Sequence, residues 1–133
     1  MRSFVFSLLV LLTFPGCSVL TPKTPEEIVA HRAQKRIDLL MSGDYEASYE
    51  FATPGYRTTE GAGRYGTRWS GVGMWLSAVV TRVDCGGTVE TDRCEATVKV
   101  NYKAARFEPT ETYLKEDWLL IDGNWYLYQN FGE

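Results

Sequence analysis

Residues 94–102 read Cys-Glu-Ala-Thr-Val-Lys-Val-Asn-Tyr, and small or apolar residues alternate with polar ones over the whole stretch. An alternation with a period of two is typical of a β-strand that has one buried face. The buried face predicted for this strand consists of Cys94, Ala96, Val98, Val100 and Tyr102. The stretch therefore predicts a strand of a half-buried antiparallel sheet.

The preceding run, residues 75–85, also suits a strand, and Gly86-Gly87-Thr88 predicts a hairpin loop between the two. If Cys85 lies opposite Cys94, the matching pairs on the same face are Val83 with Ala96, Val79 with Val100 and Trp75 with Ala104. Register and hydrophobic face then agree, and a one-residue slip would destroy that agreement. The pairing predicts a disulfide between Cys85 and Cys94. It would be a structural staple, because the sequence has no Cys-X-X-Cys redox motif.

Helical signals precede the strands. Thr24 can cap a helix, Pro25 suits its first turn and Glu27 completes a capping box. Apolar residues then recur at helical spacing and predict one amphipathic helix over residues 25–42. Arg36 is expected among its polar residues.

A second, short helix is predicted over residues 45–52. Asp44 can cap it, and Pro54-Gly55 is expected to end it. Residues 56–73 contain several glycines and no sustained period. We expect a short helix or a loop around residues 59–69.

Residues 111–131 predict a second hairpin, since Asp122-Gly123 is a favourable turn dipeptide between two apolar runs. Its register stays open because Leu119, Leu120 and Ile121 are all apolar, so that a two-residue turn and a bulged turn both fit. Helices followed by antiparallel strands indicate an α+β domain with the helices packed on one face of the sheet.

The first residues have the pattern of a signal peptide. Arg2 precedes the uncharged, mostly apolar run Phe4–Phe14, which ends in Pro15-Gly16-Cys17. The run suits the apolar core of a signal peptide and is too short for the roughly 20 residues of a membrane-spanning helix. Residues 1–16 are therefore expected to direct export, and an exported protein can form the disulfide.

The charged start, the apolar core and Gly16-Cys17 together resemble the signal of bacterial lipoproteins. The resemblance implies that Cys17 receives a diacylglycerol on its sulfur and becomes the new N-terminus of a linker, residues 17–23. Two or more acyl chains anchor firmly, because each buried methylene contributes about 0.8 kcal/mol. Ser18 implies sorting to the outer membrane of the cell envelope, with the domain of residues 24–133 in the periplasm. The alternative is an ordinary secretory signal cut near Gly16.

Charge and residue counts exclude several functions. A chain of 133 residues has room for one domain. Its net charge of -3 offers no positive field to attract nucleic acid. His31, expected on the surface of the first helix, is the single histidine, which excludes a two-histidine metal site. We expect no metal, no cofactor and no nucleic-acid partner.

Two further stretches point to a family. Residues 42–51 read Ser-Gly-Asp-Tyr-Glu-Ala-Ser-Tyr-Glu-Phe, and residues 118–125 carry a turn between two tryptophans. With the order of elements, they resemble the NTF2-like superfamily, which includes SnoaL-like proteins with a cystatin-type α+β fold. The resemblance covers residues 25–131. It implies N-terminal helices packed on a curved antiparallel sheet, an NTF2-like cone around an apolar cavity.

Inside such a cone, the candidate pocket residues are Trp75, Tyr102 and Trp118, although aromatic residues at strand spacing are also typical of a core. Isomerase-like members of the superfamily need a carboxylate inside the cone. Glu116 can share a face with Trp118 and is the candidate acid. The alternative for Glu116 is a solvated strand residue, and this alternative is the favoured one.

We expect a non-catalytic envelope lipoprotein whose domain binds a hydrophobic ligand or a protein partner. The alternative is a small isomerase- or dehydratase-like enzyme acting on a hydrophobic molecule inside the cone. A pocket of a few hundred Å³ containing a buried carboxylate would favour the enzyme, and a cone filled by side chains would exclude it. The superfamily also leaves a homodimer through exposed strands open.

Overall fold

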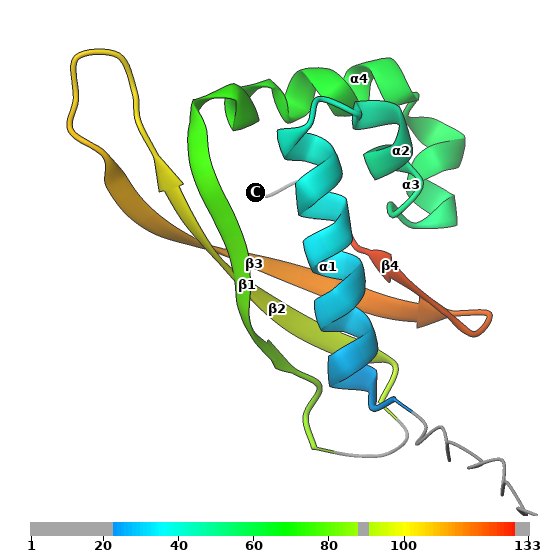
Figure 1. Ribbon diagram of the computed structural model, residues 1–133. Helices are drawn as coiled ribbons and strands as arrows, with labels where there is room; N and C mark the ends of the chain where they lie inside the picture. Colours follow the sequence, from blue (N-terminus) through cyan, green and yellow to red (C-terminus); the bar gives the residue numbers. More distant parts are fainter. Residues whose placement is uncertain (1–22, 88–90, 130–133) are drawn as a thin grey trace, which may run out of the picture.

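The computed structural model describes residues 23–87 and 91–129, so the expected signal peptide, Cys17 and most of the linker lie outside the described residues. The helices are α1 (Pro25–Met41), α2 (Tyr45–Tyr49), α3 (Pro54–Thr59), α4 (Ala62–Arg68) and the 3₁₀ helix η1 (Ser70–Met74). The strands are β1 (Trp75–Asp84), β2 (Arg93–Tyr102), β3 (Thr110–Ile121) and β4 (Asn124–Leu127). They form one curled antiparallel sheet in the order β1-β2-β3-β4, and α1 lies across one of its faces (Figure 1). The expected α+β architecture is confirmed.

The first helix begins as the sequence predicts. The Thr24 side chain accepts a hydrogen bond from the backbone N–H of Glu27, and the Glu27 carboxylate accepts one from the Thr24 N–H, which completes the capping box. The buried side of α1 carries Val29, Ala33, Ile37 and Leu40, together with Arg36. The expectation that Arg36 is a polar surface residue is therefore wrong. Its position, three residues after Ala33 and four before Leu40, belongs to the buried stripe of the helix.

The short helices differ from the prediction at Pro54. The second helix ends at Tyr49, and Pro54 begins α3 instead of ending a helix. The Thr53 hydroxyl caps α3 by accepting from the Tyr56 N–H, and Pro54 suits this first turn because it has no N–H to satisfy. The stretch expected to be a helix or a loop forms α4. In Figure 1, α2, α3 and α4 gather around one end of α1.

The hairpin of β1 and β2 follows the predicted register only near the disulfide, where Val83 pairs with Ala96 and Cys85 is bonded to Cys94. The expected pairs of Val79 with Val100 and Trp75 with Ala104 are wrong. Ala78 pairs with Val100, Trp75 pairs with Tyr102, and Val79 is 52% exposed. The pairing shifts between Val80 and Arg82, and again between Trp75 and Ser77. Each bulge adds a residue to β1 and exchanges the faces of the side chains beyond it.

The second hairpin takes the two-residue turn. Ile121 pairs with Asn124 across Asp122-Gly123, and both turn residues have positive φ, 48° and 78°. Such a turn matches the twist of antiparallel strands, and glycine adopts this backbone without strain. The outer edge of β4 is joined to the helical region by a short parallel bridge between Leu127 and Ala52.

Candidate functional site

A pocket of about 470 Å³ lies between the helical segment formed by the end of α4 and η1 and the sheet. On the sheet it is lined by the start of β1, the end of β2 and the first half of β3. Its apolar wall consists of Trp69, Val72, Met74, Trp75, Tyr102 and Leu114. The Trp69 and Trp75 rings meet edge to face with their centroids 6.4 Å apart. The polar and charged residues of the same wall are Arg68, Thr112, Lys115 and Glu116. We call this space the Trp69–Trp75 pocket.

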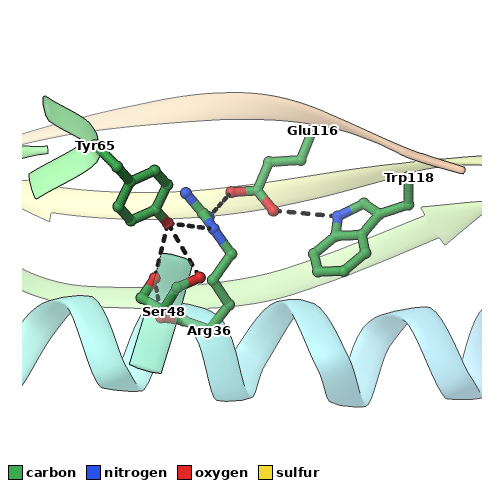
Figure 2. A network of polar contacts seen from close by, with 5 residues as sticks. All are labelled: Arg36, Ser48, Tyr65, Glu116 and Trp118. Carbon is green, nitrogen blue, oxygen red and sulfur yellow. Dashed lines mark hydrogen bonds and ion pairs between the residues drawn. The ribbon is translucent and has the colours of Figure 1, made fainter. Parts of the chain in front are cut away.

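Behind this wall, a chain of buried polar side chains connects β3 with α1, α2 and α4 (Figure 2). Arg36 Nη1 donates to Glu116 Oε1 at 2.6 Å, and Arg36 Nε donates to the Tyr65 hydroxyl at 3.2 Å. The Tyr65 oxygen is 2.8 Å from the Ser48 hydroxyl. The Trp118 Nε1 donates to the second Glu116 oxygen, Oε2, at 3.2 Å. Each member is buried, so solvent does not compete for these bonds.

The ion pair between Arg36 and Glu116, at the centre of this network, is buried and packed against an aromatic ring. Arg36 is fully buried and Glu116 is 6% exposed. The guanidinium carbon of Arg36 lies 4.3 Å from the centroid of the Trp69 ring, a cation–π distance. Trp69 and Glu116 both line the pocket, so the Arg36 charge lies directly behind the pocket wall.

A cluster of tyrosines supports the network from the helical side. Tyr49, Tyr56 and Tyr65 contact one another edge to face, with centroids 5.6 to 6.3 Å apart. Burial raises the pKa of the Tyr56 phenol, with the nearby Arg68 charge acting in the opposite direction. The Tyr56 phenol therefore stays neutral at ordinary pH.

Three of the four candidate pocket residues lie together. Trp75, Tyr102 and Glu116 line the Trp69–Trp75 pocket, and Trp75 pairs with Tyr102 instead of the predicted Ala104. Trp118 is fully buried in the core, where its ring meets Phe51 edge to face, and it is not part of the pocket wall. Glu116 does share a face with Trp118, as predicted, but it is buried and paired instead of solvated.

Sequence reasoning missed Arg36, Trp69, Tyr65 and Ser48. For Arg36 a signal was present, because its spacing places it in the apolar stripe of α1. For the other three no periodic pattern exists, since they come from short helices and from a junction between two of them. Only their packing brings them to Arg36.

The described residues offer no other obvious chemical site. No group of three or more His, Cys, Asp or Glu side chains within residues 23–87 and 91–129 could hold a metal ion. His31 lies exposed on α1. In the same part of the chain, every helix is too short or too polar to cross a bilayer.

No known family profile matches the sequence, and no curated protein matches it. Among solved structures, the fold is similar to that of a SEC-C motif containing protein from Rhodopseudomonas palustris, with a TM-score of 0.56 and 12% identity over 74% of this chain and 73% of that one. It is also similar to a sec-c motif containing protein from Psychrobacter arcticus, with a TM-score of 0.63 and 10% identity. That match covers 81% of this chain but only 62% of the other, less than two thirds of its length. At such identities the likeness concerns the fold alone, an α+β domain with helices on a curled antiparallel sheet.

Proposed function

We propose that this chain is an exported binding protein, anchored in the cell envelope by a lipid on Cys17, and that the Trp69–Trp75 pocket holds an apolar small molecule. The pocket is the observation that carries the proposal. Its volume, about 470 Å³, falls within the range of small-molecule sites. A wall of two tryptophans, a tyrosine and three aliphatic or thioether side chains favours an apolar ligand.

Binding is favoured over catalysis by the state of Glu116. A general base needs a carboxylate oxygen that can reach the proton of a substrate. Both Glu116 oxygens already accept hydrogen bonds, from Arg36 and from Trp118. Among the described residues, Glu116 is the one acid in the pocket wall, so an isomerase-like mechanism would have no second carboxylate there.

Membership of the NTF2-like superfamily remains part of the proposal. Its support is the Gly43-Asp44 joint between α1 and α2 and the curled sheet that follows the helices. These features concern the fold, and folds of this kind host many functions. The binding function is therefore argued from the pocket and not from the family.

The pocket can be tested by filling it. Thr112 and Tyr113 are neighbours on β3, but Thr112 lines the pocket whereas Tyr113 is exposed on the other face. The neutral apolar dye N-phenylnaphthylamine should bind the purified full chain with a rise in fluorescence. Thr112→Trp should weaken binding at least about ten-fold, or about 1.4 kcal/mol, and Tyr113→Trp should not. Equal binding by both variants would overturn the proposal.

The anchor can be tested in cells. Cys17→Ala removes the sulfur that would carry the diacylglycerol, so the protein should move from the membrane fraction to the soluble fraction. Ser18→Ala keeps the sulfur and should stay with the membrane. Sedimentation of cell lysates followed by immunoblotting measures both variants. A Cys17→Ala protein that stays with the membranes would show that the lipid anchor is wrong.

A further inference from the structure

Arg36 has one donor group without a partner. Its Nε and Nη1 donate to Tyr65 and Glu116, but its Nη2 is buried and meets no acceptor among the described residues. Buried donors in native proteins are nearly always satisfied, and a hydrogen bond from a charged group is stronger than a neutral one. An acceptor brought by a ligand would complete the hydrogen bonding of this guanidinium.

The position of Nη2 connects this donor to the pocket. The guanidinium lies between two residues of the pocket wall, because its plane faces the Trp69 ring and its Nη1 binds Glu116. In Figure 2 one guanidinium nitrogen of Arg36 carries no dashed line, and this is the unpartnered Nη2. Arg36 itself does not line the pocket, so a ligand could reach the buried Nη2 only if a residue of the wall moved.

Trp69 is the wall residue whose movement would uncover Arg36, since its ring lies over the guanidinium. It is half-buried and lies at the junction where α4 ends and η1 begins, with no side-chain cap on η1. A second hollow of about 270 Å³ lies on its other side, and Trp69 and Glu116 line both spaces. A rotation of the Trp69 indole into that hollow would open a path from the pocket to Arg36.

The charges near the pocket bear on the kind of acceptor. Two cations, Arg68 and Lys115, also line the pocket, but Lys115 is paired with Glu95 and the Arg68 charge acts on the Tyr56 phenol, so within the described chain Glu116 is the charged group in direct contact with Arg36. Glu116 already balances the Arg36 charge at 2.6 Å. A ligand carboxylate at Nη2 would be a second anion near Glu116, and like charges close together in a buried site repel strongly. A neutral oxygen would accept the hydrogen bond without that repulsion.

We propose that the ligand is a neutral apolar molecule with a carbonyl oxygen that accepts a hydrogen bond from Arg36 Nη2, and that Trp69 is its movable cover. This inference rests on the proposed binding function of the same pocket. It adds a chemical class, ketones, esters or amides of apolar compounds, to a pocket that would otherwise select only by size and apolarity.

Three ligands with the same ring test the class on the purified full chain. Cyclododecanone, cyclododecane and cyclododecanecarboxylate are titrated against bound N-phenylnaphthylamine. The ketone should bind about ten- to hundred-fold more tightly than the hydrocarbon, the range expected for a hydrogen bond from a charged donor. The carboxylate should bind more weakly than the ketone. A ketone no tighter than the hydrocarbon, or a carboxylate tighter than the ketone, would overturn this inference and leave the binding function intact. Displacement by none of the three would overturn both.

A double substitution tests whether Arg36 donates a hydrogen bond to the carbonyl oxygen of the ligand. Arg36→Met with Glu116→Gln removes both buried charges and keeps an acceptor for Trp118, so the preference for the ketone should be lost while the hydrocarbon still binds. Arg82→Met with Asp84→Asn removes an exposed ion pair of β1 and should keep the preference. A ketone preference that survives the first double variant would contradict the role of Arg36. The wild-type comparison decides the ligand class even if that variant fails to fold.

Discussion

The Arg36–Glu116 pair and the Lys99–Glu111 pair each join a cation to a glutamate, at nearly equal distances of 2.6 Å and 2.7 Å. The first pair lies behind the pocket, with side chains 0% and 6% exposed. The second lies on the outside of β2 and β3, with side chains 39% and 41% exposed. Exposed pairs contribute about 0 to 1 kcal/mol, whereas breaking a buried pair costs about 3 to 5 kcal/mol. The environment, and not the distance, decides what each pair does.

The two pairs also differ in what surrounds them. Glu111 accepts from Lys99 and from the Tyr113 hydroxyl, and all three groups can be hydrated. Glu116 and Arg36 are joined to a network that crosses four elements, so neither can lose its partner and turn to water. A change at the buried pair should therefore spread through the helical region, and a change at the exposed pair should remain local.

The largest expected effect comes from removing one buried partner. Glu116→Ala leaves the Arg36 charge buried and unpaired, and it should lower the free energy of unfolding by about 3 to 5 kcal/mol. Glu111→Ala removes an exposed partner and should leave the free energy of unfolding almost unchanged, because water replaces the lost contact. Urea unfolding followed by tryptophan fluorescence measures both. Similar losses for the two variants would contradict the comparison.

Removing both buried partners should cost less than removing one. Arg36→Met with Glu116→Gln leaves no unpaired charge, so it should be about 2 kcal/mol more stable than Glu116→Ala. The same urea experiment, completed with Arg36→Met alone and Glu116→Gln alone, gives the coupling energy of the pair. A double variant no more stable than Glu116→Ala would mean that the charge is not the cause of the loss.

Removing the tyrosine hydroxyl beside each ion pair, Tyr65 at the buried pair and Tyr113 at the exposed one, should have a smaller effect on stability. Tyr65→Phe removes the oxygen that accepts from Arg36 Nε and contacts Ser48, and should cost about 1 to 3 kcal/mol because buried polar groups lose a partner. Tyr113→Phe removes an exposed hydroxyl bonded to Glu111 and should leave the stability almost unchanged, because water can replace that bond. Thermal unfolding of both variants checks the contrast. Equal effects would indicate that the network is not sealed from water.

The smallest effect concerns the titration of the exposed pair. The hydrogen bond from Lys99, followed by that from Tyr113, lowers the pKa of Glu111. A lowered folded-state pKa means that the stabilisation is fully present above the ordinary value of 4.5 and is lost as the pH falls through the lowered one. In Lys99→Met the Glu111 pKa should rise toward the ordinary value, measured by NMR titration of the side-chain carboxyl. An unchanged pKa would contradict the assigned cause.

Several elements could be predicted because their causes are local. The capping box of α1 needs only Thr24 and Glu27, three residues apart. The turn of the second hairpin needs only Asp122 and Gly123. The disulfide followed from a strand pattern that holds near Cys85, because no bulge lies between Cys85 and Val83.

The pocket was predictable only in part, because residues far apart in the sequence form its wall. Trp75 and Tyr102 were found as aromatic residues of strands, but the two bulges of β1 that pair them leave no signal in the alternation. The burial of Glu116 depends on Arg36, which lies 80 residues earlier in the chain. From the sequence alone, a charged residue within the apolar stripe of a helix is assigned to the surface, because the partner that would neutralise it in the core is not known.

By itself, the sequence determined where α1 and α2 begin, where the second hairpin turns and which cysteines meet, since each depends on side chains that are close along the chain or on a simple alternation. The tertiary structure alone decided that Arg36 is buried, that Glu116 is its partner and that Trp69 covers the pair. These outcomes depend on which faces α1, α4 and β3 turn toward one another. The reason is physical: hydrogen bonds between neighbours along the chain are encoded locally, whereas the cost of burying a charge is set by everything packed around it.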